Sequence, residues 1–183
     1  MKSTPTPIEG LLILEPRVFF DDRGYFFESF NGKAFNELTG QREPFVQDNQ
    51  ARSVRNVLRG LHYQNNPTPQ AKLIRVLDGV IWDVVVDIRP GSPTYGEWYG
   101  VELSAENRLQ LLVPRGFAHG YSVLSETAEI MYKCDNYYDK SSEGGILYND
   151  PALNIDWKID LANAIVSEKD VVQPLMADAR IEF

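Results

Sequence analysis

The segment from Arg59 to Gln64 (RGLHYQ) carries one of the two histidines in the chain. An imidazole titrates close to neutral pH, so histidine is the side chain best suited to accept a proton there. The alternation of residues around His62 indicates a β-strand, which would hold the ring in a fixed direction. We therefore expect His62 to act as a general base.

Two apolar runs that meet at Asp78-Gly79 predict a second part of the site. Asp-Gly is typical of two-residue hairpin turns, and a hairpin over Lys72 to Asp87 pairs Ile74 with Asp83. Charged side chains on an apolar face are rare unless they are paired or used. A hairpin end that is open to water would explain Lys72 and Asp83 on this face equally well. The predicted shared face consists of Lys72, Ile74, Val76, Ile81, Asp83 and Val85.

Two further strands carry polar side chains. His119, the second histidine, shares a strand face with Tyr121, and Tyr132 shares one with Ile130. A buried Tyr132 would need a partner for its hydroxyl, and a ligand could supply one. Near the end of the chain, Ser167 and Asp170 have the spacing of a capping pair at a helix start, which gives Asp170 a structural explanation.

These residues must be positioned by an all-β fold. About ten short strands are separated by turns every eight to twelve residues, which predicts a sandwich or barrel with a few short helices. Two aromatic runs flank the Asp-Asp-Arg-Gly turn at 21–24 and indicate a hairpin. Residues 31–39 are typical of a short helix that ends at Gly40.

Strict alternation over Val57 to Gln64 separates His62 from Arg59. It places Leu58, Gly60, His62 and Gln64 on one face of the strand. Arg59, Leu61 and Tyr63 then lie on the other face. A β-bulge at Gly60 would bring Arg59 and His62 to the same side.

Length and composition set outer limits. The 183 residues predict a single domain over 1–183. The net charge of −8 argues against a nucleic-acid backbone binder. The single cysteine, Cys134, cannot form an intramolecular disulfide, so we expect a cytoplasmic protein. The apolar run Leu11 to Leu14 is too short for a membrane span and lacks the flanks of a signal peptide.

The spacing Pro114-x-Gly116-x-x-His119 resembles the second signature of the cupins, which are small barrels of the jelly-roll type. Their first signature has two histidines one residue apart, and then a glutamate seven residues before a glycine. A charged lysine has no lone pair to give a metal, so we expect a metal-free barrel and disfavour a metal-dependent oxygenase. The matching positions here hold His62, Gln64, Lys72 and Gly79.

A larger set of segments is similar to the family of the dTDP-4-dehydrorhamnose 3,5-epimerases, which are cupin-type enzymes of dTDP-rhamnose biosynthesis. The segments occur in the family's order from about Pro7 to Asp170. Each is weak alone, but their joint order and spacing are highly specific. They are Asp21 to Phe26 with Glu28, Gln47 to Asn49, Arg59 to Gln64, Lys72, Pro114 to Gly120, and Tyr132 with Tyr138.

This resemblance implies an isomerase that converts dTDP-4-dehydro-6-deoxy-D-glucose to dTDP-4-dehydro-L-rhamnose without a metal or cofactor. The C4 ketone acidifies the hydrogens on C3 and C5, a base removes one, and a proton returns to the opposite face of the enolate. By position, His62 is the base, Tyr132 the acid and Lys72 the group that stabilises the enolate oxygen. The resemblance makes Asp170 the partner of His62, whereas alternation alone favours Asp83.

The resemblance also implies a homodimer in which the N-terminal region contributes to the partner's site. Tyr138 would stack on the thymine of the dTDP-4-keto-6-deoxyhexose substrate. The implied nucleotide contacts are Arg23, Glu28, Gln47, Asn49, Arg59, His119, Glu143 and Lys169.

Two alternatives stay open at this point. A related epimerase that acts at one carbon only, or on another 4-keto sugar, would use the same base and lysine. A metal-free cupin that binds sugar without catalysis is disfavoured by the joint presence of His62, Lys72 and Tyr132. The sequence does not determine the sugar, the order of the two epimerisations or the polysaccharide served.

Overall fold

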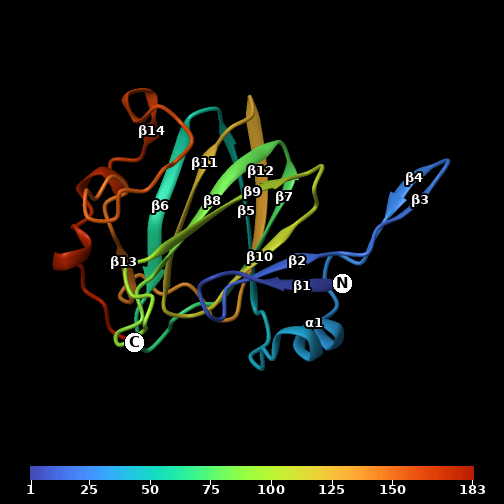
Figure 1. Cartoon of the computed structure of the whole chain (residues 1–183), viewed down its shortest axis with the longest axis horizontal. Coiled ribbons are helices and arrows are strands. Elements are labelled where there is room, and N and C mark those ends of the chain that lie inside the picture. The colour runs from blue at the N-terminus through green and yellow to red at the C-terminus, as the bar shows by residue number, and fades with distance from the viewer.

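The computed structural model describes residues 1–183, and most strands form two antiparallel sheets that face each other (Figure 1). The predicted all-β barrel of jelly-roll type is confirmed. The first sheet has the order β1 (Lys2–Pro5), β2 (Leu12–Glu15), β10 (Gln110–Val113), β7 (Lys72–Asp78), β12 (Thr127–Cys134) and β5 (Gln47–Val54). The second has the order β13 (Glu143–Gly145), β6 (Val57–Gln64), β11 (Phe117–Val123), β8 (Val80–Asp87) and β9 (Trp98–Ser104), with the short β14 (Ile165–Val166) parallel to β6.

The main core lies between the two sheets. Because successive side chains of a strand point to opposite faces, each sheet contributes every second residue to this layer. Ile74 and Ile130 come from the first sheet, while Ile81, Val85 and Phe117 come from the second. All five are at most 3% exposed. The apolar filling occupies part of the barrel, and the polar site lies between the same two sheets.

The predicted hairpin between β7 and β8 is wrong. β7 pairs with β10 and β12, whereas β8 pairs with β11 and β9, so the chain crosses between sheets at Asp78-Gly79. Gly79 has a φ of +77°, and a Cβ there would lie 2.1 Å from the carbonyl oxygen of Thr127. The Asp-Gly signal predicted the turn but not its partner. The predicted common face nevertheless points inward, because Ile74 and Ile81 meet across the core.

The prediction that side chains alternate strictly between the two faces of β6 is also wrong. His62 pairs with His119 and Arg59 pairs with Tyr121, so three residues of β6 span two residues of β11. The extra residue is the bulge expected at Gly60, which has a φ of +126° and allows Arg59 and His62 to line the same compartment. A Cβ on Gly60 would lie 2.5 Å from the Cα of Gly120. Close approach of the two strands therefore requires glycine here.

The N-terminal region forms a projecting arm. β3 (Phe19–Asp21) and β4 (Gly24–Phe26) pair with each other, as predicted, and extend away from the two sheets (Figure 1). Phe20 is 70% and Phe26 67% exposed. The predicted helix follows as α1 (Gly32–Thr39), with Asn31 as N-cap and Gly40 in the left-handed conformation at the C-cap. No helix in the structure is long and apolar enough to cross a bilayer.

The C-terminal segment covers the outer face of the second sheet. It contains three short 3₁₀ helices, η1 (Leu161–Asn163), η2 (Asp170–Val172) and η3 (Met176–Asp178). Trp157, 2% exposed, packs on this face with Leu58 and Leu61 of β6. The buried Asp150 carboxylate accepts from the amide of Met176 at 2.7 Å, and Asn65 bonds to the backbone at Arg180 and Glu182. The first bond joins two parts of the segment, and the Asn65 bonds tie the segment to the residue that follows β6.

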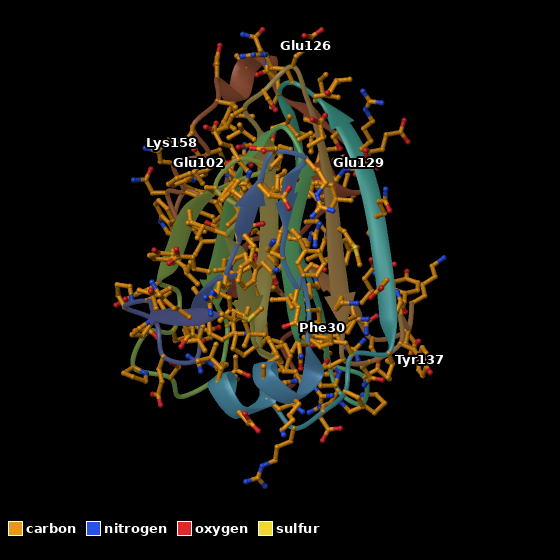
Figure 2. All side chains as sticks on the ribbon, turned by 90° about the vertical axis from the view of Figure 1, so that its right-hand side faces the viewer. Phe30, Glu102, Glu126, Glu129, Tyr137 and Lys158 are labelled. Atoms are coloured by element: carbon orange, nitrogen blue, oxygen red, sulfur yellow. The ribbon has the colours of Figure 1, made fainter.

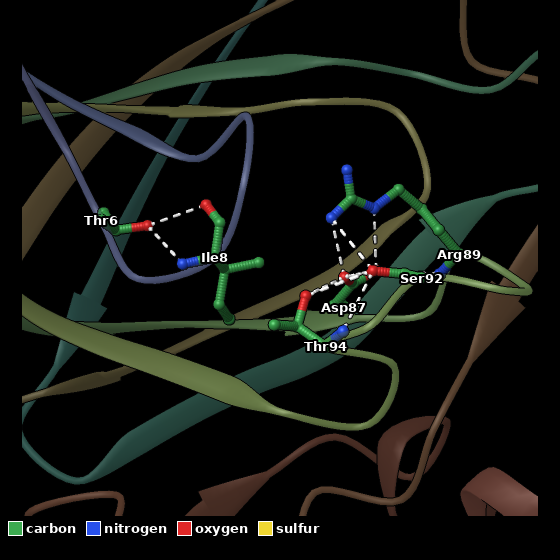
Figure 3. A network of polar contacts seen from close by, with 6 residues as sticks. All are labelled: Thr6, Ile8, Asp87, Arg89, Ser92 and Thr94. Atoms are coloured by element: carbon green, nitrogen blue, oxygen red, sulfur yellow. Dashed lines mark hydrogen bonds and ion pairs between the residues drawn. The ribbon is translucent and has the colours of Figure 1, made fainter.

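A buried carboxylate fixes the loop that leaves β8. Asp87, at the end of that strand, accepts from Arg89 Nη2 at 2.7 Å, Ser92 Oγ at 2.6 Å and Thr94 Oγ1 at 2.7 Å (Figure 3). Burial alone would raise the pKa of Asp87, but these donors outweigh it and hold the pKa well below its ordinary value. The network therefore anchors a loop with a charge that stays ionised.

Candidate active site

The polar side chains inside the barrel enclose two adjoining compartments. One has a volume of about 290 Å³ and is lined by Tyr138 and Glu143 among others. We name it the Tyr138 compartment. The other, the His119 compartment, has a volume of about 140 Å³ and is lined by Arg59, His119 and Tyr121 among others. The residues that line both compartments are His62, Lys72 and Tyr132.

His62 is paired with Asp170. The imidazole Nε2 lies 2.6 Å from Asp170 Oδ1, and the second carboxylate oxygen accepts from the Gly60 amide at 3.3 Å. The His62 side chain is 33% exposed and the Asp170 side chain 3%. Burial would raise the pKa of Asp170, but the bonds from His62 and Gly60 outweigh it and lower the pKa. An ionised carboxylate only accepts hydrogen bonds, so Nε2 carries the proton and Nδ1 has a free lone pair.

The choice between the two candidate carboxylates is thereby resolved. Asp170 is the partner of His62, while both oxygens of Asp83 lie 2.9 Å from Nε2 of His119. The capping interpretation of Asp170 is half correct. The Asp170 amide donates to Ser167 Oγ at 3.2 Å, but its carboxylate turns toward β6.

Lys72 brings a positive charge to the junction of the compartments. It is the first residue of β7, and it forms no ion pair with any carboxylate. Burial lowers the pKa of the Lys72 ammonium, although Cys134, Asp83 and Glu143 act in the opposite direction. An ammonium without a partner in a confined cavity can stabilise a negative oxygen of a ligand.

Tyr132 lies on the neighbouring strand β12, where its backbone pairs with that of Ile74 in β7. Burial, followed by the nearby Cys134, raises the pKa of Tyr132 to about 12. Burial also raises the pKa of the Cys134 thiol to about 11. Both groups are therefore neutral at physiological pH, and the Tyr132 phenol holds a proton that it can give.

The five residues at the Tyr138 end form one hydrogen-bonded chain. The Tyr138 hydroxyl donates to Glu143 at 3.3 Å, and Glu143 is in an ion pair with Lys169. The Tyr138 amide donates to Gln47, which in turn donates to Asn49 at 3.0 Å. Tyr138 is 55% exposed, and the adjacent Tyr137 projects from the surface (Figure 2). The structure thus brings together five of the predicted nucleotide contacts.

Arg59 and His119 lie in the other compartment. Arg59 Nε donates to Ser53 Oγ at 3.2 Å, and its guanidinium has no carboxylate partner. His119 is 7% exposed and is fixed by Asp83. These residues place cationic and donor groups on the side of the junction opposite Tyr138.

Arg23 and Glu28 are not brought to the cavity of this chain. Arg23 lies in the turn of the projecting arm and pairs with Asp21, with Nη2 2.6 Å from Oδ2. Glu28 accepts from Asn31 near the start of α1. Neither residue lines the two compartments formed by its own chain.

Gln64 and Tyr121 are two further residues of the site that were not predicted from the sequence. Gln64 donates to the carbonyl of Tyr137 and accepts from the amide of Asp139, so it fixes the loop that carries Tyr138. Tyr121 lines the His119 compartment. Their strand spacing was the available signal, since each lies two residues after a histidine in the same strand.

The side chains of the site do not include a cluster of three or more His, Cys, Asp or Glu residues suited to holding a metal ion. The arrangement offers a base with a free lone pair, a phenol that can give a proton, and an ammonium that lines the same two compartments. These three groups suit proton removal beside a carbonyl and return of a proton from another direction.

Comparison with known proteins identifies the family of the chain. The family model for dTDP-4-dehydrorhamnose 3,5-epimerase matches residues 5–178. The chain is 51% identical over 179 residues to the dTDP-4-dehydrorhamnose 3,5-epimerase of Shigella flexneri, covering 98% of each. The crystal structure of this epimerase from Elizabethkingia anophelis NUHP1 is 56% identical, with a TM-score of 0.94 and 97% of each chain covered. A crystal structure of dTDP-6-deoxy-D-glucose-3,5-epimerase from Legionella pneumophila Philadelphia 1, in complex with dTDP-4-keto-L-rhamnose, is 48% identical, with a TM-score of 0.93 and coverage of 97% and 93%.

Proposed function

Because the chain belongs to the dTDP-4-dehydrorhamnose 3,5-epimerase family, we propose that its barrel cavity is the active site and that His62, Tyr132, Lys72 and Asp170 carry the reaction. The enzyme epimerises C3 and C5 of dTDP-4-dehydro-6-deoxy-D-glucose and gives dTDP-4-dehydro-L-rhamnose, in dTDP-rhamnose biosynthesis. The observation that carries the residue assignment is the junction of two compartments, which is lined by His62, Lys72 and Tyr132.

His62 removes the proton. Its Nε2 is hydrogen-bonded to Asp170, so Nδ1 accepts the proton from the carbon beside the C4 ketone. The imidazolium that forms is stabilised by the buried carboxylate, which holds the ring in one tautomer and orientation. General base catalysis of this type typically contributes about 10²- to 10⁴-fold.

Lys72 and Tyr132 complete the exchange. As the proton leaves, negative charge develops on the C4 oxygen, and the unpaired Lys72 ammonium stabilises it. Tyr132, which stays protonated up to a pH of about 12, returns a proton to the face of the enolate opposite the base. The pair of steps inverts one carbon and leaves His62 protonated and Tyr132 deprotonated. His62 then gives its proton to solvent water and Tyr132 takes one from it, and a repeat at the second carbon gives the product. The proposal requires no metal or cofactor.

The nucleotide occupies the Tyr138 compartment in this proposal. The exposed ring of Tyr138 stacks on the thymine, and Gln47, Asn49, Glu143 and Lys169 supply donors and acceptors around it. Arg59 and His119 contact the substrate from the other side of the junction. The single cysteine is a buried free thiol, which fits a cytoplasmic enzyme.

A homodimer accounts for the remaining two residues. The arm exposes Phe19, Phe20, Tyr25 and Phe26, and such a concentration of exposed aromatic side chains marks an interaction surface. We propose that the arm docks on a second copy, where Arg23 and Glu28 reach the partner's site. Mixing two inactive variants, Arg23→Ala and His62→Ala, tests this. One intact site in each mixed dimer restores about a quarter of the activity, whereas an arm that serves its own chain restores none.

The reaction itself is tested by NMR in deuterium oxide with the dTDP-4-keto sugar. Label incorporated at both C3 and C5 supports the proposal, and label at one carbon only would identify a single-carbon epimerase. A binding protein without activity would incorporate no label. The variant His62→Ala should lose exchange yet retain affinity for dTDP.

A further inference from the structure

Tyr121 carries a hydroxyl that the fold leaves without a protein partner. The residue lies on β11, two positions after His119, and lines the His119 compartment together with His62, Lys72 and Tyr132. It is 5% exposed. Its hydroxyl oxygen is inaccessible to solvent and makes no hydrogen bond. The nearby Ser53 Oγ already accepts from Arg59 Nε at 3.2 Å.

An unmade hydrogen bond on a buried hydroxyl destabilises a folded protein, and most buried polar groups are paired. Tyr63, on the neighbouring strand β6, illustrates the usual solution. It is 4% exposed, and its hydroxyl donates to the carbonyl of Arg180 at 2.7 Å. A phenylalanine at 121 would fill the same apolar space without the penalty. The hydroxyl at 121 therefore has no evident use in the folded chain alone.

The surroundings of Tyr121 determine what it can do for a ligand. Burial raises the pKa of Tyr121, although the adjacent Ser53 hydroxyl and then Arg59 act to lower it, so the phenol remains protonated and donates. It is close enough to Tyr132 to contribute to the raised pKa of that residue. It does not line the Tyr138 compartment, where the nucleotide binds in the proposed function.

We propose that the Tyr121 hydroxyl donates a hydrogen bond to an oxygen of the bound hexose, as a substrate-contacting residue in addition to the four that carry the reaction. This inference rests on the proposed function, because it takes the ligand to be a nucleotide sugar whose hexose reaches the junction of the compartments. Sugar oxygens are abundant acceptors, and they would satisfy the one phenol of the cavity wall that is both buried and unpaired.

The test compares Tyr121→Phe with the wild type in binding of dTDP and of dTDP-glucose, a sugar nucleotide without the C4 ketone. Loss of one neutral hydrogen bond should weaken dTDP-glucose binding about 3- to 10-fold and leave dTDP binding unchanged. The melting temperature should stay the same or rise. Tyr63→Phe is the matched control for stability, since it removes a satisfied hydroxyl and should lower the melting temperature.

Three results would overturn the inference. The first is unchanged dTDP-glucose affinity, as expected if the hydroxyl does not reach the ligand. The second is equal weakening of both ligands, which would move the contact to the phosphates. The third is a fall in melting temperature like that of Tyr63→Phe, which would show a partner within the fold. The binding measurement does not depend on turnover. If the wild type binds dTDP-glucose but exchanges no deuterium into the 4-keto sugar, the proposed function is rejected, while the binding comparison can still be interpreted.

Discussion

The cavity contains two histidine–aspartate pairs that differ in how they are enclosed. In the His62–Asp170 pair the histidine is 33% exposed, and one carboxylate oxygen is used by the ring while the other is used by Gly60. In the His119–Asp83 pair the histidine side chain is 8% exposed, and both carboxylate oxygens face the same ring nitrogen. The same two residue types therefore build an accessible pair and an enclosed pair.

This difference in exposure indicates which pair can exchange protons with a ligand. His62 lines both compartments, so its free nitrogen can meet a substrate from either side. His119 is 7% exposed, lines only the His119 compartment and has its Nε2 against both oxygens of Asp83, so it offers a ligand less access. We expect substitutions in the first pair to act mainly on turnover and those in the second mainly on stability and binding.

The largest effect is expected from replacing the accessible histidine. His62→Asn removes the base but keeps a polar side chain of similar size, so kcat should fall about 10²- to 10⁴-fold. His119→Asn should change the affinity for substrate more than kcat. Steady-state kinetics of both variants measures the split between kcat and KM. Equal losses of kcat in the two variants would contradict the distinction between the pairs.

Lys72 lines both compartments and should show a conflict between stability and activity. Its pKa is lower in the folded protein than the ordinary 10.5, so the unfolded chain binds more protons between those two values and stability rises with pH there. Lys72→Met should lower kcat about 10²- to 10³-fold. It should also raise the melting temperature at pH 7. The gain should shrink as the pH approaches 10.5, and a variant that is less stable at pH 7 would refute the argument.

Asp170→Asn tests the carboxylate of the accessible pair. A charge-assisted hydrogen bond contributes about 1.5–3 kcal/mol, so kcat should fall about 10- to 100-fold. Because the pKa of Asp170 lies below its ordinary 3.8, its stabilising contribution is complete above that pH and is lost as the pH falls through the folded value. Wild type and variant should therefore differ in stability at neutral pH and converge in acid, as measured by urea unfolding at several pH values.

The smallest effect on turnover is expected from Asp83→Asn. The substitution removes the charge beside His119, and the free energy of unfolding should fall by about 1–3 kcal/mol while kcat changes only a few-fold. Thermal unfolding and kinetics on the same preparation decide this. A loss of kcat as large as that of Asp170→Asn would show that the enclosed pair also takes part in proton transfer.

Local patterns predicted the elements better than their partners. The strand around His62, the arm and the helix ended by Gly40 follow from residue types over short distances. The strands that pair with β7 and with β8 could not be predicted, because an Asp78-Gly79 turn is compatible with a crossing between sheets as well as with a hairpin. The choice between Asp83 and Asp170 as the partner of His62 depends on the path of the C-terminal segment. The alternation of residues along one strand gives no information about that path.

The functional residues divide in the same way. Resemblance to a family and the inward face of β7 led to His62, Lys72 and Tyr132, which the structure brings to one junction. The unpaired state of the Tyr121 hydroxyl depends on every neighbour in three dimensions, so only the coordinates show it.

The distance of Asp170 from His62 along the chain has a consequence for biosynthesis. The carboxylate is encoded 108 residues after the imidazole that it orients. Synthesis must therefore continue into η2 before the imidazole can meet its carboxylate, and a chain that stops earlier would keep His62, Lys72 and Tyr132 but lack the group that orients the ring.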